Sequence, residues 1–333
     1  MRLVQFKTPD SRRRVGVVSE DGQSLHVLRD VARIHDLALE ANRLGASLSQ
    51  LVTDRVGQES LAYAGVVSDK LLLPPLDHSD PAHCYVTGTG LNHLGSAQAR
   101  NAMHTKLSQE SNTLTDSMKM FQLGLEGGKP APGQIGAQPE WFYKGDGECL
   151  VPPEQPLEIP SFALDGGEEA EIVGLYVIGE GGAVLRVGYA LGNEFSDHIL
   201  ERQNYLYLAH SKLRNCSIGP ELLLGPLPEH IEGTVQVWRD GQPIWSDTFL
   251  TGEANMSHSL ANIEHHHFKY AEHRRPGDLH IHFFGADMFS FKDRLRLEDG
   301  DVMVVTFEGF GRPLRNPIRI DRSEPKFVCV SAL

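Results

Sequence analysis

Three carboxylates stand at the ends of two neighbouring apolar segments of the chain. Glu169 and Glu171 precede the apolar run of residues 172–179, and Glu194 ends the apolar run that follows it. Because alternate side chains of a strand share a face, Glu169 and Glu171 are expected to point the same way. Carboxylates buried side by side repel each other unless a positive charge lies between them. The pattern therefore predicts a site for a hard divalent cation with oxygen ligands, in the first place Mg2+.

A turn signal connects the two apolar runs. Residues 180–182 read Glu-Gly-Gly, which is typical of the tight turn of a β-hairpin. With the turn centred on its middle residue, Glu171 lies opposite Leu191, and Glu194 lies within about one residue of the partner of Glu169. The hairpin then gathers all three carboxylates at one end. A solvent-exposed acidic strand end is the alternative interpretation of the same residues.

Two lysines are candidates to act beside this cation. Lys212 follows Glu194 and precedes the segment 216–220, and Lys144 ends the aromatic run of residues 141–144. A lysine beside a carboxylate-bound cation can bind a substrate carboxylate, or act as a base when its pKa is lowered. For either lysine taken alone, a surface position is the alternative.

The histidines point to structure more than to metal binding. Residues 265–267 are three consecutive histidines in a helical segment, where neighbouring side chains splay apart and cannot meet at one ion. We interpret them as a polar or interface face. His280 and His282 share one face of a strand, and packing across the sheet is favoured over a metal pair.

Composition excludes several classes of partner. The 333 residues carry 31 basic and 44 acidic side chains, a formal net charge of -13, which argues against nucleic acid and anionic membranes. No apolar run approaches the roughly 20 residues of a membrane-spanning helix. The four cysteines lack the spacing of a zinc site or a disulfide framework, so free thiols in a reducing cytoplasm are expected.

The pattern of predicted helices and strands that would position the carboxylates and lysines suggests two domains. They are a small α+β domain over residues 1–75 and a catalytic domain over residues 76–333. From residue 160 onward the pattern is mostly short strands, so the fold is expected to be α+β and mainly β. The polar segment 102–138 is long enough for a lid. Further expected elements are strands at 3–6, 15–18 and 84–88, and helices at 30–47, 197–208 and 257–270 and from residue 91 onward.

Taken in order, the motifs between residues 80 and 320 resemble the fumarylacetoacetate hydrolase superfamily. The matching segments are Gly90-Leu91-Asn92, Phe142-Tyr143-Lys144, Glu169 with Glu171, 188–196, Lys212, 217–220, 276–278, 298–301 and 308–317. The resemblance implies a distorted β-roll or barrel around Mg2+, or Mn2+ in its place, held by Glu169, Glu171 and Glu194. It also implies a homodimer or higher homo-oligomer. Substrate contacts are expected from Gly90, Asn92, His93, Ser96, Lys144 and Lys212.

The chain departs from the family pattern at several positions. Glu194 stands where the family has Asp, His198 where it has Arg, and residues 285–287 read Gly-Ala-Asp in place of Gly-Thr-Pro. Ser96 and Ala99 replace the His and Glu that activate water in the hydrolytic members. Loss of that dyad argues against hydrolysis of a carbon–carbon bond, which needs a positioned base.

The resemblance is nearer to the branch that dehydrates 2-keto-3-deoxy sugar acids in pentose oxidation. It implies that an α-keto acid binds the cation through its carboxylate and keto oxygens. Lys212 is the first candidate to remove the C3 proton, and Lys144 is the second. Loss of the C4 hydroxyl from 2-keto-3-deoxypentonate gives 2-oxoglutarate semialdehyde. The first alternative is a hydrolase or decarboxylase of a β-diketo acid, with water activated by His93 or by segment 102–138. The second is a non-catalytic sugar-acid-binding protein.

Overall fold

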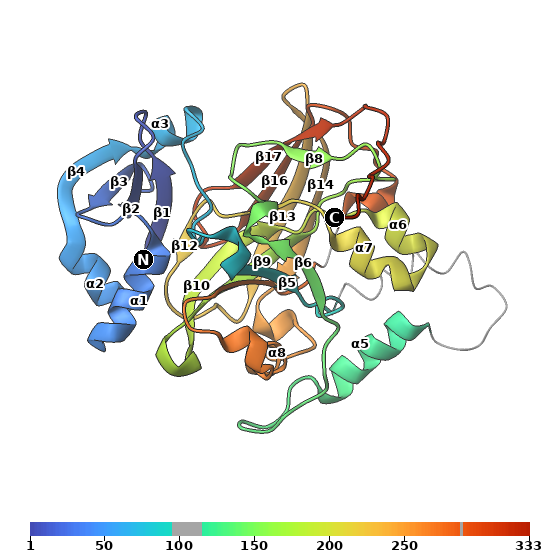
Figure 1. The fold of residues 1–333 in the computed structure, drawn as a ribbon, viewed down its shortest axis with the longest axis horizontal. Coiled ribbons are helices and arrows are strands. Elements are labelled where there is room, and N and C mark those ends of the chain that lie inside the picture. The colour runs from blue at the N-terminus through green and yellow to red at the C-terminus, as the bar shows by residue number, and fades with distance from the viewer. Residues whose placement is uncertain (95–114, 287–288) are drawn as a thin grey trace.

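Two β-sheets form the framework of the molecule, with helices around their edges (Figure 1). The computed structural model describes residues 1–94, 115–286 and 289–333. The larger sheet has the strand order β4 (Val56–Ala62), β3 (Ser24–Leu28), β2 (Arg13–Val18), β1 (Arg2–Lys7), β12 (Leu222–Leu223), β10 (Val184–Asn193), β9 (Ala170–Ile178), β15 (Leu279–Phe283), β5 (Cys84–Gly88) and β6 (Phe142–Asp146). Beside this path, β11 (Cys216–Ile218) pairs with β10 and with β7 (Leu150–Val151).

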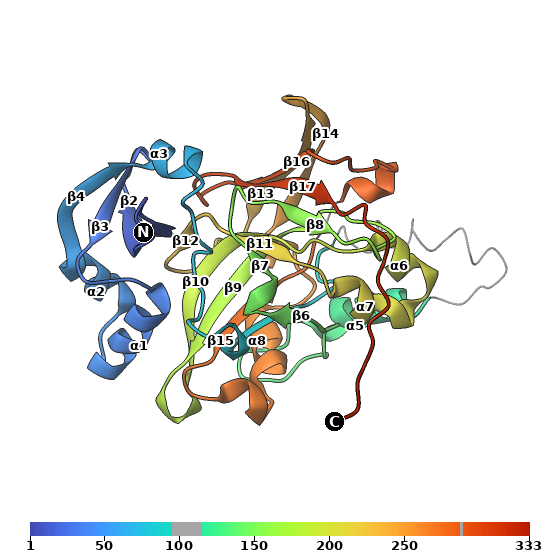
Figure 2. The same cartoon turned by 45° about the horizontal axis from the view of Figure 1, so that its top comes forward.

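The smaller sheet covers one face of the larger one. Its order is β14 (Gln242–Thr251), β13 (Ile231–Arg239), β16 (Val302–Phe307), β17 (Leu314–Ile320) and β8 (Leu157–Ile159). The helices are α1 (Ile34–Leu44), α2 (Leu48–Arg55), α3 (Tyr63–Ser68), α5 (Asp116–Gly127), α6 (His198–Gln203), α7 (Leu208–Lys212) and α8 (Leu260–Phe268). Figure 2 shows the smaller sheet above the larger one, with α6 and α7 at one end.

Strand β9 is buried on both faces, because each face meets a different core. Its residue Ile172 packs with Val235 and Phe307 of the smaller sheet. Leu175 and Val177 face the opposite way, into the largest core cluster. A strand covered on both sides reads as a continuous apolar run, which is the pattern of residues 172–178.

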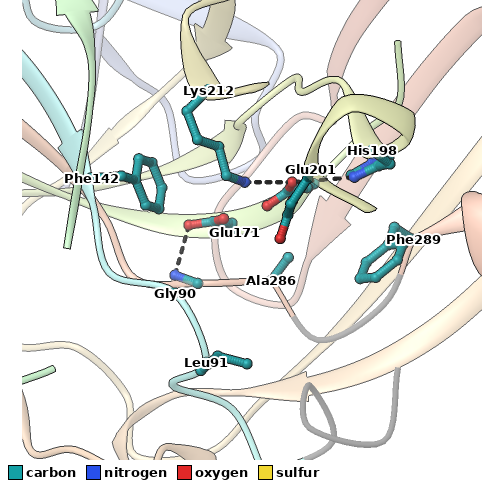
Figure 3. Close-up of a pocket in the computed structure, with 11 residues that line it drawn as sticks. Gly90, Leu91, Phe142, Glu171, His198, Glu201, Lys212, Ala286 and Phe289 are labelled. Atoms are coloured by element: carbon teal, nitrogen blue, oxygen red, sulfur yellow. Dashed lines mark hydrogen bonds and ion pairs between the residues drawn. The ribbon is translucent and has the colours of Figure 1, made fainter. Parts of the chain in front are cut away.

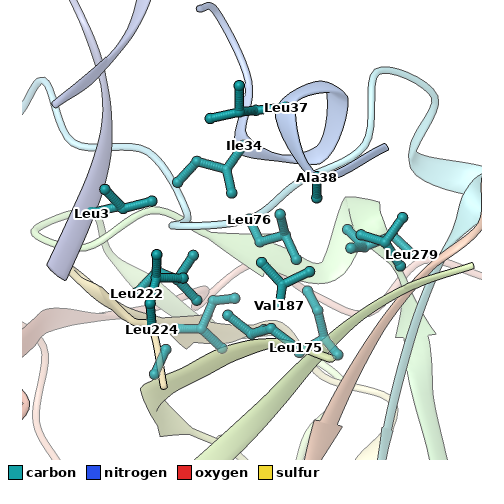
Figure 4. Packing of buried hydrophobic residues seen from close by; sticks show 14 of the residues in the cluster. Leu3, Ile34, Leu37, Ala38, Leu76, Leu175, Val187, Leu222, Leu224 and Leu279 are labelled. Carbon is teal, nitrogen blue, oxygen red and sulfur yellow. The ribbon is translucent and has the colours of Figure 1, made fainter. Parts of the chain in front are cut away.

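The N-terminal part is joined to the rest of the molecule by both sheet and core. Strand β1 pairs with β12, so the strands of this part extend the larger sheet. Figure 4 shows Leu3, Ile34 and Leu37 in one cluster with Leu175 and Leu279. The part also has a cluster of its own, built from Val4, Phe6, Val18, Leu25, Val27, Tyr63, Val66 and Leu72.

The predicted fold class is confirmed, with one correction. The chain is α+β and mainly β, but in the described residues both sheets are open and end in edge strands, so no closed barrel forms. The predicted strands at 3–6, 15–18 and 84–88 correspond to β1, β2 and β5, and the helix expected at 30–47 is α1. Helix α1 ends where Gly45 adopts a left-handed φ of 63°.

The helix expected from residue 91 onward is wrong in its described part, and the physical reason is local. Leu91 has a left-handed φ of 52°, and His93 forms a β-bridge with Met256 instead of a helical turn. Segment 102–138 contains α5, which the sequence pattern had not indicated. All four cysteines are free. Within the described residues, no helix combines the length and the apolar character needed to span a membrane.

Candidate active site

The β9–β10 hairpin places the three carboxylates together. The two strands are antiparallel, with Glu171 opposite Gly192 and Ala170 opposite Asn193. The amide of Glu194 donates to the carbonyl of Glu169 at 2.8 Å, so these two residues lie opposite each other. The register predicted from the turn is one residue off, because a bulge between Arg186 and Gly188 inserts an extra residue into β10.

Glu169, Glu171 and Glu194 converge as the pattern predicted. Each offers one carboxylate oxygen, these oxygens lie within 4.8 Å of one another, and all three residues are buried. One oxygen of Glu171 accepts a hydrogen bond from the amide of Gly285 at 2.7 Å, which fixes the orientation of this side chain. A cavity of about 30 Å3 opens at the group, enough for an ion or a water molecule.

The electrostatics of this group fit a divalent cation. Burial, with the neighbouring charges of Glu194 and Glu169, raises the pKa of Glu171 well above its ordinary value. Burial and the charge of Glu169 raise the pKa of Glu194 to about 7. Three buried carboxylates in contact are costly to ionise without a counter-charge, and an all-oxygen ligand set is the one that Mg2+ or Mn2+ prefers. The residues present therefore fit the predicted cofactor.

Lys212 lies directly between two of these carboxylates. Its Nζ donates to Oε1 of Glu169 and to Oε2 of Glu194, both at 2.6 Å, and to Oγ of Ser196 at 3.2 Å. Burial alone would lower the pKa of Lys212, but the two carboxylates outweigh it and raise this pKa above its ordinary value. In this arrangement Lys212 is an ammonium ion that holds the carboxylates together. Its charge also lies 4.9 Å from the centre of the Phe142 ring, which lines the cavity.

Lys144 lies behind Glu194 and does not line the cavity. Its Nζ donates to the carbonyls of Phe195 at 2.5 Å and of Lys212 at 2.9 Å. It also forms an ion pair with Glu194 at 2.8 Å, with both side chains fully buried. These contacts anchor Glu194 and the end of α7, so they give Lys144 a positioning role.

The remaining predicted substrate residues divide into three kinds. Gly90 lines the cavity. Asn92 does not, because its amide donates to the carbonyl of Phe284 at 2.9 Å and its side-chain oxygen accepts from the amide of His258 at 3.0 Å. His93 is buried away from the cavity, with Nε2 at 2.7 Å from the Thr251 hydroxyl. Ser96, like Ala99 and Asp287, lies outside the described residues.

Helix α6 supplies two further cavity residues. His198 stacks on Phe289, with ring centres 5.0 Å apart, and its Nδ1 lies 3.6 Å from Oε1 of Glu169. Glu201 follows three residues later, lines the same cavity, and with Glu169 and His198 forms a second group of possible metal ligands. Glu201 was not among the predicted site residues, although its i, i+3 spacing from His198 on a predicted helix was an available signal. Nothing in the sequence pointed to Phe289.

Asp197 holds this helix in place. It caps α6 by accepting from the amide of Leu200 at 2.9 Å, and it forms an ion pair with Arg214 at 2.9 Å. Arg214 follows Lys212 by two residues. The ion pair therefore ties the helix that carries His198 and Glu201 to the end of the helix that carries Lys212.

Two of the three consecutive histidines, His266 and His267, are buried, which corrects the predicted polar or interface face for these two. Only His265 is exposed, whereas His266 bonds to the carbonyl of Gly136 at 3.1 Å and His267 lies 3.0 Å from a ring nitrogen of His280. None of these histidines belongs to either possible ligand group among the described residues. The preference for packing over metal binding fits this arrangement.

Comparison with known proteins supports an enzyme of the dehydratase type. No protein-family model matches the chain. A curated protein from Haloferax volcanii (strain DS2), a probable 2-keto-3-deoxyxylonate dehydratase, is 27% identical over 279 residues, which cover 80% of this chain and 83% of that protein.

Similar solved structures share the fold over nearly the whole chain. A 2-keto-3-deoxyarabinonate dehydratase superposes with a TM-score of 0.70 at 17% identity, covering 97% of this chain and 100% of that one. A second structure, the 2-keto-3-deoxy-D-arabinonate dehydratase complexed with magnesium and 2,5-dioxopentanoate, gives 0.68 at 16% identity with the same coverage. A 5-carboxymethyl-2-hydroxymuconate delta-isomerase from Mycobacterium smegmatis gives 0.58 at 18% identity, covering 96% of this chain and 100% of that one. The resemblance inferred from the motifs is confirmed.

Proposed function

We propose that this chain is a divalent-metal-dependent dehydratase of a 2-keto-3-deoxy sugar acid. One observation carries the proposal: Glu169, Glu171, Glu194 and Lys212 converge at one buried cavity. A solved relative is complexed with magnesium and 2,5-dioxopentanoate, which is the same compound as 2-oxoglutarate semialdehyde. We therefore assign 2-keto-3-deoxypentonate as the substrate and the semialdehyde as the product, within cytoplasmic sugar-acid catabolism.

The site supplies the charge and the base that this elimination needs. A divalent cation on the three carboxylates would polarise the keto group of the substrate and stabilise the negative charge that develops when C3 loses its proton. With a cation on these carboxylates, the interactions that raise the pKa of Lys212 would weaken, and its amine would be able to accept that proton. Lys212 is preferred over Lys144 because Lys212 lines the cavity and Lys144 does not.

A second proton transfer must reach the oxygen on C4. The C3–H bond first gives its proton to Lys212 and leaves its electron pair on the substrate. The C4–O bond then breaks, a C3=C4 double bond forms and the hydroxyl leaves as water. We assign the proton for this hydroxyl to Glu201, which lines the same cavity from α6 (Figure 3). His198, stacked on Phe289, forms the adjoining wall. Tautomerisation of the dehydrated product then gives the semialdehyde.

The direct test is turnover. Purified protein with Mg2+ is incubated with each C4 epimer of 2-keto-3-deoxypentonate, and semialdehyde formation is followed with and without a chelator. The proposal fails if neither epimer is turned over. Full activity in Glu171→Gln would refute the metal assignment, whereas Glu180→Gln, which changes an exposed carboxylate of the hairpin turn, should match the wild type.

Exchange of the C3 protons with deuterated water separates the two proton transfers. Lys212→Met should lose both exchange and dehydration, because it removes the first step. Glu201→Gln should keep C3 exchange, seen by proton NMR, while water release falls by roughly 100-fold. Loss of exchange in Glu201→Gln, or unchanged dehydration, would overturn its assigned role.

The alternative hydrolase or decarboxylase of a β-diketo acid predicts pyruvate or CO2 in the same assay. Of its two candidate sources of water activation, His93 lies away from the cavity, and burial lowers the pKa of His93 to about 4. The other candidate is segment 102–138, of which residues 102–114 lie outside the described residues. Dehydration is therefore the function that the geometry favours.

A further inference from the structure

The chain ends in an arm that leaves the molecule after β17. Residues 322–333, called here the C-terminal arm, are exposed throughout. Phe327, Val328 and Val330 are 91%, 83% and 93% exposed. Figure 2 shows the arm running from β17 to a free end. Consecutive β-branched and aromatic residues favour a strand, and an apolar run of this kind is usually covered by a partner surface.

An open trough lies near the root of this arm. The amide of Asp321 donates to the carbonyl of Ile159 at 3.0 Å, and Pro160 lines the first of two adjoining hollows. The hollows measure about 380 and 440 Å3 and share Leu213 and Arg214. Residues of two edge strands, β6 and β8, line the first hollow. The two hollows together are called here the trough.

The second hollow of the trough is apolar and uncovered. Phe162, Leu164 and Tyr207 line it, and they are 65%, 48% and 43% exposed. Exposed apolar side chains gathered along a hollow form the kind of surface that receives a peptide. The chain therefore presents both an uncovered apolar arm and an uncovered apolar receptor for one.

The polar groups of the trough complement the polar groups of the arm. Asp146 and Glu148 line the first hollow, and the arm carries Lys326 immediately before its apolar run. Arg214 is 7% exposed, and its Nε has no hydrogen-bond partner among the described residues. Arg214 lines both hollows, so its guanidinium presents a positive charge to the backbone carbonyls of a bound arm. Along the arm, Lys326 comes before the apolar run. Along the trough, the hollow that contains Asp146 and Glu148 adjoins the apolar hollow, so the arm and the trough have matching orders of charged and apolar surface.

We propose that the C-terminal arm of a second copy of this chain lies in the trough, and that the exchange is reciprocal. In the structure the chain's own arm lies outside its own trough, because none of residues 322–333 lines either hollow. The base of the arm lies beside the trough of the same chain. In a dimer with two-fold symmetry, the arm of each subunit can therefore lie in the trough of the other. This inference does not rest on the proposed function.

The test measures molar mass by light scattering on size-exclusion fractions of the full chain. The wild type should be a dimer or a higher even assembly. Deletion of residues 324–333 and the variant Phe162→Asp should each weaken association by at least roughly 30-fold, the size expected for loss of a buried aromatic anchor. Leu44→Asp, which changes a residue 63% exposed on α1, is the matched control and should associate like the wild type. Circular dichroism checks that each variant is folded.

Mixing the two defective chains decides between exchange and other arrangements. The arm-deleted chain keeps its trough, and the Phe162→Asp chain keeps its arm, so together they should form a mixed dimer that neither forms alone. A monomeric wild type, or an arm-deleted chain that still associates like the wild type, would overturn the proposal. So would lowered stability of the arm-deleted chain with unchanged mass, because it would place the arm in its own trough.

Discussion

Lys212→Met should destabilise the metal-free protein strongly. The ammonium group lies 2.6 Å from both Glu169 and Glu194, and the lysine and Glu194 side chains are 2% and 0% exposed. At an effective dielectric constant of about 20, Coulomb attraction at this distance is about 6 kcal/mol for each pair. Desolvation of the ammonium offsets much of this attraction, and loss of one partner from a buried ion pair costs about 3–5 kcal/mol. We expect a loss of that size at neutral pH.

The loss should depend on pH and on metal in defined directions. Without Lys212, the pKa of Glu194, which burial already raises, should rise further above that of the unfolded chain because a neighbouring positive charge is lost. The cost is then fully present above the raised pKa and is relieved as the pH falls and Glu194 protonates. A divalent cation should also restore stability, because it replaces the missing positive charge.

Urea unfolding in chelator, at neutral and mildly acidic pH, measures the free energy of unfolding of both proteins. Lys119→Met is the matched control, because this exposed lysine pairs with Asp116 across one helical turn and should contribute little. Equal stability of Lys212→Met and the wild type at neutral pH would refute the buried ion-pair arrangement. Failure of Mg2+ to stabilise the variant would refute the cation-binding carboxylates.

Three further outcomes are expected. A Cβ at Gly88 would lie 2.2 Å from the Phe142 ring, so Gly88→Ala should displace this cavity wall and lower kcat/KM by roughly tenfold or more in a steady-state assay. Burial lowers the pKa of His282 from 6.5 to about 3, so below pH 6.5 only the unfolded chain takes up this proton. The free energy of unfolding therefore decreases as the pH is lowered. His282→Asn should remove about 1 kcal/mol of the fall between pH 7 and 5.5, measured by urea unfolding. Because Glu171 and Glu194 have raised pKa values, metal binding near pH 7 should release protons, which calorimetry in two buffers of different ionisation heat detects.

The sequence predicted what depends on local pattern. Alternation placed Glu169 and Glu171 on one face, and the turn at residues 180–182 brought Glu194 to them. The one-residue error in register arose at a bulge, whose position depends on packing of β10 against its neighbours. Residues 91–94, the described part of the helix expected there, are not helical for a similar reason, because the tertiary contacts of Asn92 and His93 override the local preference.

Contacts between segments that are distant in the chain could not be predicted from the sequence. The match of Phe142-Tyr143-Lys144 to a motif did not show that Phe142 lines the cavity while Lys144 turns away from it. Because β6 is a strand, Phe142 and Lys144 share its buried face. The division between them follows from the carbonyls of Phe195 and Lys212, which capture the Lys144 amine. The backbone donor that Gly285 offers Glu171 comes from 114 residues away and leaves no local signal.

The charges around the cavity explain why the site favours a divalent cation. Three buried carboxylates, Glu169, Glu171 and Glu194, meet two buried lysines, Lys144 and Lys212, so the acids outnumber the bases by one charge. Without a cation, burial and the mutual repulsion of the carboxylates favour protonation and raise the pKa values of Glu171 and Glu194. A divalent cation, together with the carboxylate of a bound substrate, would balance these charges and would leave Lys212 with weaker partners. The same balance that favours metal binding therefore also prepares the amine for proton transfer.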